Sequence, residues 1–222
     1  MTAEVKSRPF EDYQVDEYEK KRYRGLDQRL VDSREKTIVK KIYKKIAPSA
    51  GLLLDLPCGY GRFSALSSGT GFYLVQSDIS LAMVKRALNR PLKENLFRAG
   101  AVADAIFGLP FKENVFQAVL SMRFFHHLHQ REDRLTVLTE FHRVSSSWVV
   151  LSFYRSNFLH IFQRKLRRRI KKSRTRIKML TWREFKKELS GAGFKVKKKF
   201  SLFPGLHGQQ IVWLEKIKDN NI

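Results

Sequence analysis

The feature that most constrains the fold is an apolar run that ends in an acid and passes at once into a glycine turn, LLLDLPCGYG at residues 52–61. A short apolar run bounded by turn residues is typical of a buried parallel strand. Gly59 and Gly61 let a ligand approach the backbone without meeting a Cβ atom, and a helix that starts here presents free N–H groups to an anion. The stretch therefore predicts a strand, a tight turn and a helix start that bind a partly anionic ligand.

The hydrophobic pattern of the whole chain predicts a doubly wound α/β fold. Strands are expected near 52–56, 72–77, 97–101, 116–121, 147–153, 194–202 and 209–216. Helices are expected at 17–29, at 33–46 with Ser33 in its N-cap region, and near 61–68, 80–89, 131–144 and 181–190. No helix separates the last two strands, so they should pair antiparallel. We expect a seven-stranded, mostly parallel sheet with a C-terminal antiparallel hairpin and helices on both faces.

Two cofactor classes fit the glycine turn. Gly59-x-Gly61-x-x-Ser64, followed by Asp78 nineteen residues after Gly59, comes close to a dinucleotide-binding fingerprint. The strand that ends in Asp55, four residues before Gly59, instead resembles motif I of the class I S-adenosylmethionine-dependent methyltransferases. Four further segments resemble that family's motifs in the same order: QSDISLAM at 76–83, ADAIFGLPF at 103–111, FQAVLSMRFFHHL at 116–128 and EFHRV at 140–144. Five ordered motifs across residues 50–155, together with the late hairpin, favour the methyltransferase family.

The resemblance implies S-adenosylmethionine as the cofactor and assigns roles to individual side chains. Asp55 would lie beside the cofactor's ammonium group, Asp78 would accept the ribose hydroxyls, and Asp104 would accept the adenine amine. The resemblance also places in the cofactor site Pro57, Gly59, Gly61, Ile79, Met83, Ala105 and Arg123. Pro57 stands where the family usually has its first loop glycine. From the residues alone, Asp78 is also a candidate helix N-cap, and Ile79 and Met83 are candidate core residues.

Two histidines follow the fourth expected strand, at the sheet edge where ligands bind in open α/β folds. His126 or His127 is a candidate general base, or a group that holds the acceptor. The alternative is that both cap or pack the start of the next helix. The histidines and the lone cysteine lack the paired spacing of metal ligands, so we expect no metal site.

The positive charge of the chain is most concentrated between the fifth strand and the last helix. The formal net charge is +23, and residues 164–178 hold ten Lys or Arg and no acid. Apolar residues recur every four positions at Phe158, Phe162, Leu166 and Ile170. We expect a basic amphipathic helix inserted at 154–180. It predicts contact through 158–178 with an anionic substrate or an anionic membrane surface, with RNA as the alternative.

Length and composition define the setting of the protein. Its 222 residues fit an N-terminal helical extension at 1–47 and a methyltransferase domain at 48–222. The single cysteine, Cys58, allows no internal disulfide, and no run of 18 apolar residues occurs. We therefore expect a cytoplasmic protein, with a peripheral position at the inner membrane surface as the alternative.

These features together predict methyl transfer to a small, or lipid- or glycan-linked, anionic acceptor. The first alternative is a tRNA or rRNA methyltransferase whose insertion clamps the phosphate backbone. The second alternative is a cofactor-binding module without catalysis. The intact set of Asp55, Gly59, Gly61 and Asp78 argues against that module.

Overall fold

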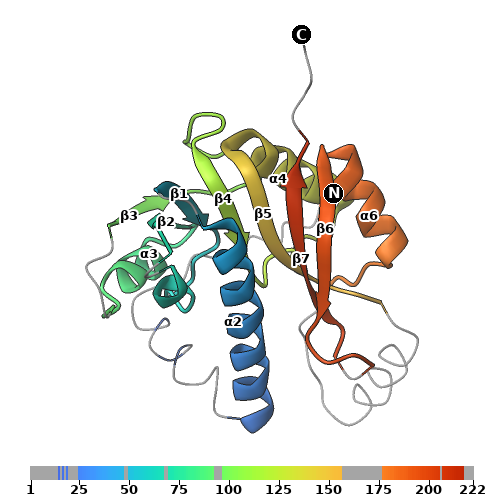
Figure 1. Cartoon of the computed structure of the whole chain (residues 1–222), viewed down its shortest axis with the longest axis horizontal. Helices are drawn as coiled ribbons and strands as arrows, with labels where there is room; N and C mark the ends of the chain where they lie inside the picture. The colour runs from blue at the N-terminus through green and yellow to red at the C-terminus, as the bar shows by residue number, and fades with distance from the viewer. Residues whose placement is uncertain are drawn as a thin grey trace, which may run out of the picture.

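The computed structural model describes residues 15, 17, 19, 25–47, 50–67, 70–92, 97–156, 177–205 and 207–217. Its centre is a seven-stranded sheet in the order β3-β2-β1-β4-β5-β7-β6 (Figure 1). The strands are β1 (Gly51–Asp55), β2 (Phe72–Asp78), β3 (Arg98–Val102), β4 (Phe116–Ser121), β5 (Ser145–Tyr154), β6 (Phe194–Ser201) and β7 (Gln209–Lys216). All neighbouring pairs are parallel except the two that β7 forms with β5 and β6. The predicted fold class is confirmed, and β7 is the antiparallel strand, inserted between β5 and β6.

The order of the strands reverses between β1 and β4, because β2 and β3 extend the sheet on one side and β5 to β7 on the other. Crevices outside the carboxyl ends of the strands at such a reversal are the usual ligand sites of open α/β sheets. Asp55 ends β1 and Ser121 ends β4, so both lie at this point. The topology therefore directs the search for a site to the loops that follow β1, β2 and β4.

Helices cover both faces of the sheet. They are α2 (Leu26–Ile46), α3 (Leu81–Leu88), α4 (Arg131–Val144) and α6 (Trp182–Gly191), with a 3-10 turn η1 (Ser64–Leu66) after β1. On one face the apolar side of α2 packs against Leu53 and Leu120. On the other face α4 and α6 pack against Leu54 and Val119. Because successive strand residues point to opposite faces, the neighbours Leu53 and Leu54 belong to two separate cores. No helix in the described part of the chain has the length and apolar composition needed to span a bilayer.

Two expected helices are corrected by the structure. Residues 61–68 were expected to be helical, but only the three residues of η1 form a 3-10 turn. Gly61 has φ +77°, outside the helical region, and the hydroxyl of Ser67 donates to the Ser64 carbonyl. Local hydrogen bonds of this kind compete with helix formation, so the loop after β1 stays compact and irregular.

The N-terminal helix boundary is also corrected. Helix α2 begins at Leu26, with Gly25 in an extended conformation at its N-cap, so the expected helix at 17–29 does not continue to 29. Ser33 lies inside α2, where its carbonyl accepts a hydrogen bond from the Thr37 hydroxyl. Residues 15, 17 and 19 are helical. The extra length of α2 brings its first turns over the carboxyl edge of the sheet, where Asp32 and Glu35 contact the loop after β1.

Candidate active site

The end of β1 carries a carboxyl group that is buried without a protein partner. Asp55 is 2% exposed, and neither of its side-chain oxygens has a hydrogen-bond partner among the described residues. Burial raises the pKa of Asp55 to about 8; the charge of Arg62 opposes this shift and that of Asp78 adds to it. A buried polar group without a partner is costly, and such groups in native proteins commonly meet a ligand. Asp55 is therefore suited to bind a positively charged group of a ligand that donates hydrogen bonds.

The two glycines of the loop after β1 differ in their surroundings. Gly59 has φ +51°, and a Cβ atom there would meet nothing within 4 Å. Gly61 has φ +77°, and a Cβ atom there would lie 2.9 Å from the Cα of Ala87 in α3. Gly61 is thus required for packing against α3, whereas Gly59 borders open space that a ligand can enter. Pro57, half-buried, follows a cis peptide bond on the β1 side of the loop.

Asp78, at the end of β2, joins this loop to the next one. Its Oδ2 accepts the Gly59 N–H at 3.0 Å and its Oδ1 accepts the Ser80 N–H at 3.0 Å. Burial raises the pKa of Asp78, and the backbone N–H groups of Ser80, Gly59 and Ile79 oppose that shift. The N-cap of α3 is Ser80, whose side chain accepts the Met83 N–H. The helix-cap alternative for Asp78 is therefore wrong.

The other predicted cofactor residues have mixed surroundings. Ile79 is 39% exposed at the mouth of the β2 loop. Met83 is buried in a small cluster with Val15 and Tyr60. Asp104 is half-buried, and its Oδ1 accepts the Ile106 N–H at 2.9 Å.

Ala105 packs into the core on the α4 side of the sheet. Ile79 and Asp104 thus have solvent-facing surface for a ligand, whereas Met83 and Ala105 contact mainly protein.

The N-terminal extension contacts the α3 side of this site. Val15 packs on Tyr60 and Met83, next to the glycine loop. Glu19 forms ion pairs with Arg86 at 2.8 Å and with Arg90 at 3.0 Å. These contacts place the described residues of the extension beside the loops that follow β1 and β2.

Glu35 of α2 is a central ionic residue that the sequence analysis missed. It is fully buried, and its Oε2 accepts hydrogen bonds from Arg62 and Arg123, each at 2.6 Å. Its Oε1 accepts from Arg123 Nε at 2.9 Å and from the side-chain amide of Gln209. Burial alone would raise the pKa of Glu35, but the charges of Arg62 and Arg123 hold the pKa below its ordinary value. The sequence held a sign that Glu35 is buried. It precedes the apolar Ile38 and Val39 by three and four residues, which places it on the same helix face.

Arg123, predicted as a cofactor residue, is held in place by this network. It has φ +59°, rare for a non-glycine residue, and its backbone N–H donates to the Ser152 hydroxyl at 2.7 Å. Its guanidinium forms an ion pair with Glu35 of α2 at 2.6 Å. The structure thus places Arg123 at the predicted edge, with its charge directed to α2.

The two predicted histidines lie together at the end of β4. His126 is 7% exposed, and its ring centre lies 4.0 Å from that of His127 and 5.1 Å from that of Tyr154. His127 is exposed. Helix α4 starts at Arg131 with Gln130 as its N-cap, so neither histidine caps it. Tyr154 in turn faces His207 at 6.0 Å, so aromatic and imidazole groups line this part of the edge.

The ends of the expected insertion at 154–180 meet at this histidine pair. Ser156 N–H donates to Leu180 O at 2.8 Å, and Leu180 N–H donates to Tyr154 O at 3.0 Å. Lys178 N–H donates to His126 O at 2.9 Å. The predicted apolar stripe of Phe158, Phe162, Leu166 and Ile170 lies outside the described residues.

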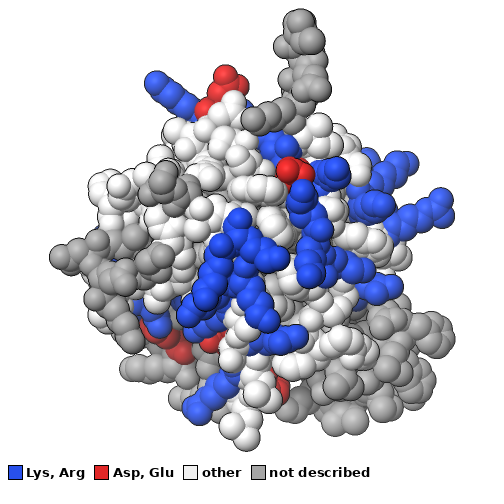
Figure 2. Space-filling view, viewed as in Figure 1, with Lys and Arg blue, Asp and Glu red and all other residues white. Residues whose placement is uncertain are grey.

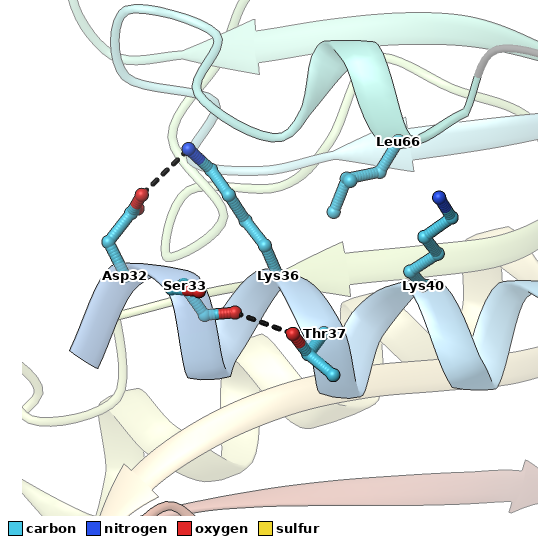
Figure 3. Close-up of a pocket in the computed structure, with 6 residues that line it drawn as sticks. All are labelled: Asp32, Ser33, Lys36, Thr37, Lys40 and Leu66. Atoms are coloured by element: carbon cyan, nitrogen blue, oxygen red, sulfur yellow. Dashed lines mark hydrogen bonds and ion pairs between the residues drawn. The ribbon is translucent and has the colours of Figure 1, made fainter. Parts of the chain in front are cut away.

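A separate hollow lies between α2 and η1 (Figure 3). It has a volume of about 370 Å³ and is lined by Asp32, Ser33, Lys36, Thr37, Lys40 and Leu66. Lys36 and Asp32 form an ion pair at 2.7 Å on its rim. The hollow contains none of the predicted site residues. Within the described ranges, no group of three or more His, Cys, Asp or Glu side chains is arranged to hold a metal ion.

Comparison with known proteins agrees with this geometry. The family model described as "Methyltransferase domain" matches residues 54–151, from the last two residues of β1 into β5. The chain carries a methyltransferase domain. The resemblance found in the ordered motifs is thereby confirmed, and the matched residues include every predicted cofactor and histidine residue of the site.

Solved structures share the fold of this methyltransferase domain at low sequence identity. Magnesium protoporphyrin IX methyltransferase from Synechocystis PCC 6803, with bound SAH, is 16% identical, with a TM-score of 0.71 over 92% of this chain and 95% of that one. A SAM-dependent methyltransferase from Methanosarcina mazei is 17% identical, with a TM-score of 0.66 over 79% and 97%. A chain of the complex between the Haloferax volcanii Trm112 methyltransferase activator and a methyltransferase is 17% identical, with a TM-score of 0.65 over 94% and 100%. No curated protein sequence matches the chain.

Proposed function

We propose that this methyltransferase moves a methyl group from S-adenosylmethionine to an anionic acceptor at the carboxyl edge of the sheet, beside His126 and His127. Its methyl donor is S-adenosylmethionine, which supplies an electrophilic methyl group on a sulfonium sulfur. The observation that carries the proposal is the buried, unpartnered Asp55 at the end of β1, together with the open space at Gly59 in the loop that follows. A dinucleotide has no ammonium group for such a carboxylate, whereas S-adenosylmethionine does.

The residues of the donor side have complementary roles in this proposal. Asp55 binds the ammonium group, and Asp78, fixed by two backbone N–H groups, accepts the ribose hydroxyls. Ile79 packs on the adenosine and Asp104 accepts its exocyclic amine. Gly59 lets the cofactor lie against the backbone. Holding the donor in this way brings the methyl group to the end of β4, where reaction needs an acceptor at near-attack distance.

The acceptor side is proposed from the histidine pair and the charge around it. His126 or His127 removes a proton from the acceptor where the acceptor must lose one. The sequence at 164–178 holds ten Lys or Arg and no acid, and its last residue, Lys178, donates its backbone N–H to the His126 carbonyl. This placement favours an anionic acceptor, small or linked to a lipid or glycan. RNA is the second candidate acceptor, favoured by the further surplus of Lys and Arg on the described surface (Figure 2).

One experiment assigns the acceptor. Purified protein with methyl-labelled S-adenosylmethionine is added to cell extract separated into lipid, glycan, RNA, protein and small-molecule fractions. We expect label in a lipid, glycan or small anionic fraction, and label in RNA would select the second candidate. Protein that binds a nicotinamide dinucleotide and not S-adenosylmethionine would overturn the proposal.

Loss of the Asp78 carboxylate should weaken cofactor binding. Asp78→Ala removes hydrogen bonds to a charged group, so we expect a loss of about 1.5–3 kcal/mol in binding free energy. Titration calorimetry measures it, with Asp27→Ala in the first turn of α2 as the carboxylate control. Unchanged affinity in a folded Asp78→Ala protein would remove Asp78 from the site.

Loss of the base should affect turnover and leave cofactor binding intact. His126→Ala or His127→Ala should lower the turnover number by roughly 10²–10⁴ with little change in cofactor affinity. His142→Ala is the matched control, because His142 lies at the far side of α4 against Phe194. If a variant loses thermal stability and activity in parallel, and regains both when it is cooled, the histidine contributes through packing alone.

A further inference from the structure

A second concentration of positive charge lies on the body of the domain, away from the insertion. Figure 2 shows Lys and Arg side chains gathered over α2 and over the neighbouring strands β6 and β7. The exposed lysines of this surface, which we term the lysine face, are Lys40, Lys41, Lys44 and Lys45 of α2 and Lys195, Lys197 and Lys198 of β6. They are far apart in the sequence, so no single charge run reveals the surface.

The two groups of lysines point over the same side of the sheet. Lys40 lines the hollow beside Leu66 of η1, so Lys41 and Lys45, about 100–140° further round the helix, lie on the flank turned to β5 and β7. On β6, the register pairs Lys195 with Glu215 and Lys198 with Trp213. Paired residues of antiparallel strands share a face.

Trp213 belongs to the core under α2, so Lys195 and Lys198 rise from the α2 side of the sheet. The two groups therefore form one surface, with the half-buried Trp148 and Trp213 in contact between them, ring centres 5.3 Å apart.

The charge of the lysine face is poorly compensated within the protein. Among the described residues, Glu215 is the one carboxylate that pairs with any of these lysines, at 3.3 Å from Lys197. Positive charges gathered on one surface repel one another. They also attract a polyanion over several ångströms in solution. The net charge of +23 means that the rest of the chain does not offset them.

The surface has the chemistry for phosphates and lacks that for a bilayer. A membrane-binding surface needs exposed apolar side chains to insert. The two large exposed apolar residues of α2 are Leu26 and Leu30, about 16 Å or more along the helix from Lys41. Near the β6 lysines, Ile217 after β7 is the single large exposed apolar residue among the described ones, too little to insert into a bilayer. Trp148 and Trp213 are half-buried rather than projecting. We propose that the lysine face binds the phosphate backbone of a nucleic acid.

The lysine face is separate from the proposed active site. Helix α2 ends before the amino end of β1, and Lys195 to Lys198 lie within the first five residues of β6, which runs parallel to β1. The face is thus near the amino ends of the strands, whereas Asp55 and Asp78 are at the carboxyl ends. It is a docking surface, and binding to it can be measured without cofactor or acceptor.

The test compares two variants that remove the same charge. One is the lysine-face variant, with Lys41, Lys45, Lys195 and Lys198 changed to Gln. The matched control changes Lys112, Arg183, Lys186 and Lys187, exposed residues outside the lysine face. Fluorescence anisotropy measures binding of an RNA duplex and a DNA duplex of equal length over a salt series, and flotation measures binding to phosphatidylglycerol vesicles. Thermal melts of both variants show that they fold.

The expected result is a difference between the two variants. The lysine-face variant should bind nucleic acid at least about tenfold more weakly at ~0.1 M salt, with a salt slope shallower by about 1 for each lost phosphate contact. The control should stay within about twofold of wild type, and the RNA and DNA arms identify which backbone is preferred. Equal losses in both variants, or no loss in either, overturn the proposal. So does vesicle binding that depends on these lysines while nucleic-acid binding does not.

Discussion

Replacing Glu35 by alanine should lower the free energy of unfolding by about 3–5 kcal/mol, the usual cost of removing one partner of a buried ion pair. Glu35 is fully buried and balances Arg62 and Arg123, whose side chains are 10% and 14% exposed. Without the carboxylate, two guanidinium groups would stay close together in a poorly solvated position. Urea denaturation followed by circular dichroism measures the change.

A matched control exists on the other face of the sheet. Glu188 of α6 forms an equally buried pair with Arg134, at 2.7 and 2.9 Å. Glu188→Ala should therefore destabilise the protein by a similar amount. Only Glu35→Ala should also lower cofactor affinity and methyl transfer under conditions where both variants are folded, because Arg62 and Arg123 belong to the loops after β1 and β4. If the two variants lose activity alike, the Glu35 network has no role beyond stability.

The Glu35 network also has a defined pH dependence. The pKa of Glu35 in the folded protein lies below the ordinary value of 4.5, so the ionised Glu35 carboxylate stabilises the fold at pH values above 4.5. This contribution is lost as pH falls through the lowered pKa. On acidification, the free energy of unfolding of Glu35→Ala should accordingly fall less from its value at neutral pH than that of the wild type.

Affinity for S-adenosylmethionine should rise by about tenfold between pH 6 and 7 and by about fivefold between pH 7 and 8. Asp55, with a pKa of about 8, is mostly protonated in the ligand-free protein over this range. The cofactor's ammonium group favours the carboxylate, so binding must release the proton. Calorimetry at pH 7 in two buffers of different ionisation enthalpy should show about one proton released per cofactor.

The same carboxyl group affects the stability of the ligand-free protein. Its folded pKa of about 8 lies above the ordinary value of 3.8, so its stabilising contribution is complete below pH 3.8 and is lost as pH rises towards 8. Asp55→Asn should remove both this trend and the pH dependence of cofactor affinity. A wild-type affinity that is flat between pH 6 and 8 would show that Asp55 is already ionised, or lies outside the site.

The sequence predicted the parts of the structure that depend on local pattern. All seven strands begin and end within two residues of their expected bounds, because apolar runs and turn residues are adjacent in the chain. Asp55 and Asp78 were singled out for the same reason, because each is the last residue of a strand, and Gly59 because it lies in the turn after β1. The histidine pair was singled out because it follows β4, and its catalytic role stays a prediction.

The missed parts depend on contacts between distant residues. Glu35 meets Arg123 and Gln209 across 88 and 174 positions of sequence. The lysine face joins α2 to β6, elements at opposite ends of the chain. The helix expected after Gly61 failed because packing against Ala87 holds that glycine at a positive φ, which a local pattern cannot show.

The junction between β5 and the insertion has a consequence for how this protein could diversify. The chain leaves the sheet at Ser156 and is hydrogen-bonded to itself again at Leu180, with Arg155 and Leu180 paired as a parallel bridge. Because both ends are tied to each other and to Tyr154, the sheet is closed off from whatever lies between them. Doubling the length of a flexible loop closed in this way costs only about 0.6 kcal/mol. Residues 157–176 can therefore be exchanged for a segment of another length and charge while β5 and α6 keep their places in the fold.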